Sequence, residues 1–142
     1  MTTLVPQRIR RLVHSAALNA RLHVGDRAWP FIDEAKEVIR KSGETWFEAH
    51  VYCIAGEIAL SSPEPDIAKA EAHFEHALSI ARRQQAKSWE LCVATSMARL
   101  WCDQGRRDEA RELLAPVYNW FTEGFDTPDL RDAKALLDEL AV

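Results

Sequence analysis

The 142-residue chain has few glycines, no long apolar run and no excess of positive charge. Its glycines stand singly at positions 25, 43, 56, 105 and 124, so the glycine-rich loop with which P-loop proteins hold a nucleotide phosphate is missing. No apolar run approaches the roughly 20 residues needed to cross a bilayer. The 18 basic and 22 acidic residues give a formal charge of −4, which is no electrostatic signature of nucleic-acid binding. We therefore expect binding neither to nucleic acid nor to a membrane.

Cysteine and strand signals are also scarce. The 3 cysteines include no Cys-x-x-Cys pair, and this usage is typical of reduced thiols in a cytoplasmic protein. No segment shows the alternation of a half-buried strand. A chain of this length can bury a core without disulfides. The sequence thus predicts one all-α domain.

One helical signature, with small and large apolar residues spaced by four and three positions, occurs three times. Self-similarity at a period near 40 residues is typical of stacked helix–turn–helix units, which bury their apolar faces only against one another. We expect the small residues to let paired helices approach, with Gly56 and Ala98 on the preceding helices giving the matching contact. The three copies are Ala28-x3-Ile32-x2-Ala35, Ala70-x3-Phe74-x2-Ala77 and Ala110-x3-Leu114-x2-Val117.

Seven helices are predicted, and short connections make successive helices antiparallel neighbours. They form three hairpins, over about residues 6–41, 44–86 and 88–121, followed by a last helix. We assign residues 1–125 to the helical repeat domain and residues 126–142 to a C-terminal capping helix of the same domain. The fold expected is all-α, with the hairpins arranged as a right-handed superhelix.

Local signals place the helix ends. A capping box of Thr45 and Glu48 predicts the start of the third helix. Asp66, Ser88 and Asp108 are expected to begin the fourth, fifth and sixth helices. Gly43 and Gly105 are suited to ending helices. Thr127 and Pro128 fit the N-cap and first residue of the last helix, whose apolar stripe is Leu130, Ala133, Leu137 and Leu140.

With this pattern the chain resembles the tetratricopeptide repeat family, in a variant with a period of about 40 residues. Residues 44–141 resemble more closely the C-terminal repeat region of large bacterial predicted ATPases. The blocks that carry this likeness include Thr45–Ala49, Arg82–Leu91, Ala98–Trp101, Leu114–Tyr118 and Trp120–Leu130. Such proteins often have an adenylate/guanylate cyclase domain or a LuxR-like DNA-binding domain elsewhere in the chain. The resemblance implies a noncatalytic protein–protein interaction or regulatory module of a bacterial signalling system.

Metal binding and catalysis find little support in the sequence. His50-x2-Cys53 and His73-x2-His76 are pairs of zinc-ligand types on the third and fourth helices. Repeat geometry directs the first pair to the concave groove and the second to the convex side, so we expect no metal site. Cys92 lies in the first turns of its helix, but no histidine is near it in sequence to activate the thiol. We expect no catalytic residue and no cofactor.

Repeat geometry also predicts a concave binding groove. A protein or peptide is the expected ligand, such as a separate ATPase or cyclase chain or a second copy of this chain. A small-molecule sensor is the main alternative, and a metal-dependent enzyme ranks below it. Most of the aromatic residues are expected to seal contacts between repeats, with one or two of them lining the groove. The candidate groove residues are Arg10, His50, Cys53, Glu57, Cys92, Thr95, Arg99, Cys102 and Asp103.

Overall fold

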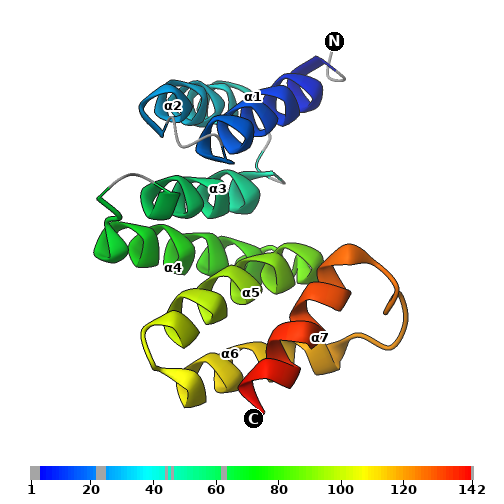
Figure 1. Cartoon of the computed structure of the whole chain (residues 1–142). Helices are drawn as coiled ribbons and strands as arrows, with labels where there is room; N and C mark the ends of the chain where they lie inside the picture. Colours follow the sequence, from blue (N-terminus) through cyan, green and yellow to red (C-terminus); the bar gives the residue numbers. More distant parts are fainter. Residues whose placement is uncertain (1–3, 22–24, 44, 46, 62–63, 142) are drawn as a thin grey trace. The chain divides into compact units, whose positions relative to one another are not determined.

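Every regular element in the described part of the chain is an α-helix, which confirms the predicted all-α class. The computed structural model describes residues 4–21, 25–43, 45, 47–61 and 64–141. No helix within these ranges is both long and apolar enough to traverse a bilayer. The helices are α1 (Leu4–Arg21), α2 (Gly25–Ser42), α3 (Glu48–Ser61), α4 (Ile67–Arg83), α5 (Lys87–Asp103), α6 (Arg107–Trp120) and α7 (Pro128–Leu140) (Figure 1).

The chain divides into two compact units between Ile80 and Ala81, within α4. In the first unit, α1, α2 and α3 pack against one another. In the second, α5 pairs with α6, and α7 packs against both (Figure 1). The superhelical course of the hairpins stays a prediction.

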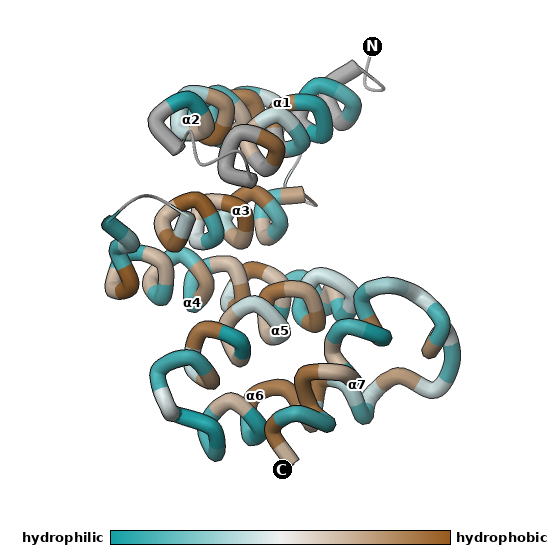
Figure 2. The backbone as a smooth tube through the Cα atoms, viewed as in Figure 1, coloured by the Kyte–Doolittle hydropathy of each residue, from teal (hydrophilic) through white to brown (hydrophobic). Residues whose placement is uncertain are grey.

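The repeated signature forms the core of both units. All nine of its positions are at most 5% exposed. Apolar residues recur turn by turn along the helices, with polar residues between them (Figure 2). The prediction that these positions are core residues is therefore confirmed.

Gly56 on α3 lies directly against the ring of Phe74 on α4. A Cβ atom at Gly56 would stand 2.6 Å from Cε1 and 2.7 Å from Cδ1 of Phe74. Since real Cβ atoms essentially never come within 3.0 Å of such a neighbour, only glycine fits here without displacing the ring. The predicted close contact at Gly56 is confirmed.

The core of the second unit is shared by three helices. Leu91, Ala94 and Ala98 of α5 and the signature residues of α6 pack with four buried residues of α7, which are Leu130, Ala133, Leu136 and Leu140. The predicted stripe of α7 is thus wrong at one position. Leu136 is buried, whereas Leu137 is only partly buried against the edge of this core.

Several predicted helix ends are confirmed. The backbone N–H of Lys69 donates to the Asp66 carboxylate at 3.0 Å, so Asp66 caps α4. Gly43 follows α2 with φ of +75°, and Gly105 follows α5 with φ of +82°. Thr127 is the N-cap of α7 and Pro128 its first residue.

Two predicted helix starts are wrong, because the N-caps lie two residues earlier in the chain. Ala86 rather than Ser88 precedes α5, and Arg106 rather than Asp108 precedes α6. Neither start has a side-chain cap. Trp46, which belongs to the block Thr45–Ala49, lies outside the described residues.

Two arginines of α6 fix the end of α7. Arg107 Nη2 donates to the Glu139 carbonyl at 2.6 Å, and the Arg111 guanidinium donates to the Leu140 carbonyl. These carbonyls belong to the last turn of α7, where helix geometry leaves acceptors without intrahelical donors. The two cations thus have a structural role at the negative end of that helix.

Candidate functional site

The predicted groove residues of the first unit differ in accessibility. Arg10 on α1 and Glu57 on α3 are exposed. His50 is half-buried, with its ring 5.0 Å from that of Phe47 in an edge-on contact. Cys53 is 1% exposed and belongs to the core. Its thiol is therefore not presented to a ligand.

The other predicted groove residues lie on α5, at spacings that repeat along one side of the helix. Arg99 and Asp103 are exposed, and Cys92 is half-buried. Thr95 is buried, and its hydroxyl donates to the Leu91 carbonyl at 2.8 Å. Cys102 is half-buried, with Arg107 Nη1 4.0 Å from its sulfur. Four of the nine candidates belong to the first unit and five to the second, and a shared groove stays a prediction.

The histidines of α4 pack among aromatic rings. The His73 ring lies 6.0 Å from Trp29 and 6.2 Å from Tyr52, and His76 meets Tyr52 edge-on at 4.3 Å. Lys69 Nζ lies 4.1 Å from the Trp29 ring centroid. Within the ranges that the structure describes, no three His, Cys, Asp or Glu side chains are grouped so as to hold a metal ion.

Burial and neighbouring charges change two pKa values in this cluster. The pKa of His73 is lowered, mainly because the ring is partly buried. The nearby charges of Lys36, Lys69 and His76 lower it further. The pKa of Tyr52 is raised, mainly by burial of the phenol and also by the charge of the Glu48 carboxylate. The cluster is thus a packed aromatic layer with bound cations at its edge.

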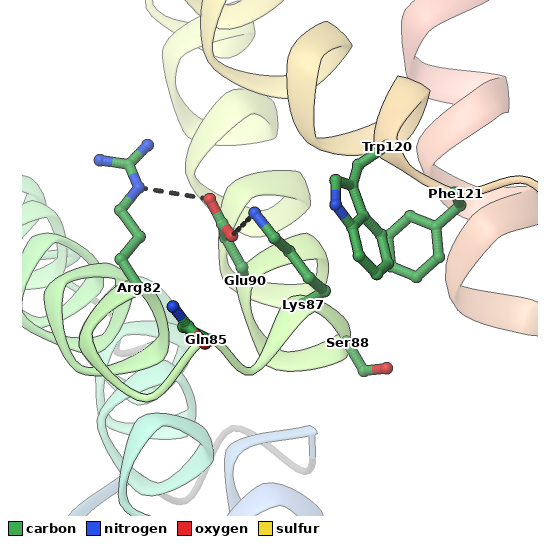
Figure 3. Close-up of a pocket in the computed structure, with 7 residues that line it drawn as sticks. All are labelled: Arg82, Gln85, Lys87, Ser88, Glu90, Trp120 and Phe121. Carbon is green, nitrogen blue, oxygen red and sulfur yellow. Dashed lines mark hydrogen bonds and ion pairs between the residues drawn. The ribbon is translucent and has the colours of Figure 1, made fainter.

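A hollow in the second unit was not predicted from the sequence. It has a volume of about 780 Å³ and lies between the α4–α5 turn and the end of α6 (Figure 3). No histidine or cysteine is among its lining residues. The lining residues are Arg82, Gln85, Lys87, Ser88, Glu90, Trp120 and Phe121.

A buried carboxylate stands at the centre of this hollow. Glu90 is 5% exposed, and its two oxygens meet two cations (Figure 3). Arg82 Nε lies 3.3 Å from Oε2, and Lys87 Nζ lies 3.2 Å from Oε1. Both cations remain accessible, so the carboxylate positions two positive groups at the wall of the hollow.

The turn between α4 and α5 brings these three residues together. Gln85 adopts a left-handed conformation with φ of +54°, and the Ala86 N–H donates to the Ala81 carbonyl at 2.9 Å. This reversal starts α5 at Lys87, one turn ahead of Glu90. Arg82, from the last turn of α4, thereby reaches the same carboxylate.

The opposite wall is aromatic. Trp120 ends α6 and is 57% exposed, and the ring of Phe121 meets it edge-on at 5.1 Å. Phe121 has extended backbone dihedrals, so the chain leaves the helix axis at this point. Lys87 Nζ lies 5.5 Å from the centroid of the Trp120 ring, within reach of a cation–π contact.

A second hollow of about 450 Å³ adjoins the first. Arg82, Lys87, Glu90 and Trp120 line both, so the two form one trough. The second hollow continues over α6, with an apolar floor and an acidic rim. Its further lining residues are Trp101, Glu109, Glu112, Leu113, Pro116 and Val117.

Comparison with known proteins adds no relative to this description. No family model, curated protein or solved structure matches the chain. The site must therefore be interpreted from its own geometry.

Only some of the residue contacts in the trough could be predicted from the sequence. Lys87 and Glu90 are spaced to pair on one helix face, and Arg82 precedes a short connection. Nothing in this spacing indicates that Glu90 is buried or that Trp120 is exposed. Trp120 is 57% exposed and lines both hollows, whereas the expectation that one or two aromatic residues line the concave groove stays a prediction.

Proposed function

We propose that this chain is a noncatalytic interaction module that binds a protein or peptide through the trough of its second unit. The observation that supports this proposal best is Trp120, a tryptophan left 57% exposed beside two cations that a buried carboxylate holds in place. Tryptophan and arginine are the residues enriched at the energetic centres of protein interfaces.

The form of the trough favours a protein segment over a metabolite. Sites for small molecules bury some 70–90% of their ligand. Here Trp120 and the Arg82 side chain, which is 56% exposed, stand at the surface and enclose little. A metabolite sensor remains the second candidate, because about 780 Å³ lies within the usual range of ligand-site volumes.

The setting we propose follows from the resemblance of residues 44–141 to repeat regions of bacterial signalling ATPases. The module would act in the cytoplasm, where its thiols stay reduced. Its partner would be a separate ATPase or cyclase chain, and a second copy of the chain is the other candidate.

Selection from a random peptide display library tests the proposal. We expect enriched peptides to bind the wild-type chain and to lose at least tenfold in affinity with Trp120→Ala. Phe125→Ala is the matched control, since Phe125 is also an exposed aromatic residue of the second unit but lines neither hollow. Absence of enrichment, or equal binding by both variants, would refute a binding role for the trough.

A further inference from the structure

The trough carries a positive charge near one end of α6 and a negative charge nearer the other, and this indicates the charge pattern of its ligand. At the Trp120 end, Lys87 Nζ lies 5.5 Å from the centroid of the Trp120 ring and 3.2 Å from Glu90 Oε1 (Figure 3). An ammonium group has three N–H donors, so Lys87 can donate to a second carboxylate while it contacts Glu90. This end therefore fits an acidic side chain.

The other end of the trough fits a basic group. Glu109 is paired with Arg106 at 2.6 Å, but the exposed Glu112 has no ion-pair partner in the part of the chain that the structure describes. Pro116 lies one turn after Glu112 and has no N–H to donate to the Glu112 carbonyl. A cation placed here would thus meet a carboxylate and a backbone acceptor.

Between the two ends the floor is apolar. Pro116 and Leu113 line it, one and two turns before Trp120 on α6. Glu112 precedes Trp120 by eight residues, which corresponds to about 12 Å along a helix axis. An extended chain covers that length in about four residues.

We propose that the trough binds an extended segment of a partner protein in which an acidic, a large apolar and a basic residue alternate with other residues. Side chains two and four positions apart in an extended chain lie on the same face, so all three point into the trough together. The acidic residue binds Lys87 beside Trp120, the apolar residue packs on Pro116, and the basic residue binds Glu112. This inference rests on the proposed binding function and specifies its ligand.

Three short peptides test the pattern, with the complete chain as receptor. The matching peptide is Gly-Glu-Ser-Leu-Ser-Lys-Gly, with both ends blocked. One control peptide replaces lysine by glutamate, and the other exchanges leucine with the serine that follows it, which turns leucine to the opposite face. Binding is followed by two-dimensional NMR of the ¹⁵N-labelled chain, with the Trp120 indole N–H, assigned from Trp120→Phe, as the local reporter.

We expect the matching peptide to bind about fivefold more tightly than either control peptide and to shift the Trp120 indole signal. Glu112→Lys should reverse the preference between the lysine and glutamate peptides. Glu75→Lys is the matched control, because it makes the same charge change at an exposed site on α4 and should leave the preference unchanged. Glu112→Gln provides a second, milder variant, which should abolish the preference without reversing it.

Two results would overturn this inference. One is equal binding of all three peptides, and the other is a preference that Glu112→Lys alters no more than Glu75→Lys does. If library-selected peptides still bind in a Trp120-dependent manner but lack the alternating pattern, the proposed ligand is wrong and the binding function stands. If no peptide depends on Trp120, both proposals fail.

Discussion

Replacement of Gly56 by alanine should destabilise the first unit, although alanine is the better helix former. The new Cβ would meet three ring carbons of Phe74 at 2.6 to 2.9 Å. Phe74 is 0% exposed, so its ring cannot turn into solvent. Overpacking of this kind costs up to about 3 kcal/mol. The gain in helix propensity is about 1 kcal/mol, so we expect a net loss of about 2 kcal/mol.

A second substitution separates these two effects. In a Phe74→Leu background the ring is absent, so Gly56→Ala should show only the propensity gain of about 1 kcal/mol. The effect of Gly56→Ala should therefore change sign between the two backgrounds. Residues in direct contact show coupling energies of up to about 3 kcal/mol in double-mutant cycles.

Urea unfolding followed by far-UV circular dichroism measures all four free energies. Ala72→Gly, at an exposed position of α4, serves as a control for propensity alone and should cost about 1 kcal/mol. If Gly56→Ala stabilised the wild-type chain as much as the Phe74→Leu chain, the close contact between α3 and α4 would be refuted.

Three further predictions concern single features. Asp66→Ala should cost about 1 kcal/mol in urea unfolding, because the Lys69 N–H loses its cap, and an unchanged midpoint would contradict that role. Truncation after Asp126 removes α7 and uncovers the α5–α6 core, so size-exclusion chromatography should show self-association; a stable monomer would show that α7 contributes no cover. The lowered pKa of His73 means that below about pH 6.5 the unfolded chain takes up a proton that the folded chain does not. Unfolding free energy should therefore fall between pH 7.5 and 5.5, and less so in His73→Gln; equal pH dependence of both would contradict the shift.

The sequence predicted the core well because burial repeats with the helical period. Ile32, Phe74 and Leu114 occupy equivalent places in three copies of one signature, and all are fully buried. Caps with a direct side-chain signal, such as Asp66, were also predictable. Where two adjacent leucines were available on α7, periodicity alone did not decide between them, and packing against α5 and α6 selected Leu136.

The trough was less predictable because it depends on backbone geometry that composition does not reveal. Gln85 reverses the chain in a left-handed conformation that glycine or asparagine would have signalled. After that reversal α5 starts at Lys87, with Ala86 rather than the expected Ser88 as its N-cap. Glu90 lies in the first turn of α5, and the α4–α5 turn also makes it the buried partner of two cations.

The buried Glu90 is better explained by the trough than by fold stability. Desolvation offsets much of the Coulomb energy of a buried carboxylate, so such ion pairs contribute little net stability. Arg82 and Lys87 are long side chains that lose rotamer entropy when they are held in place. Glu90 holds both of them before any ligand arrives, with Lys87 beside Trp120, and a ligand carboxylate then meets a cation that is already ordered. Because binding is strengthened when this ordering cost has been met in advance, the ion pairs of Glu90 connect the α4–α5 turn to the proposed recognition of an acidic residue.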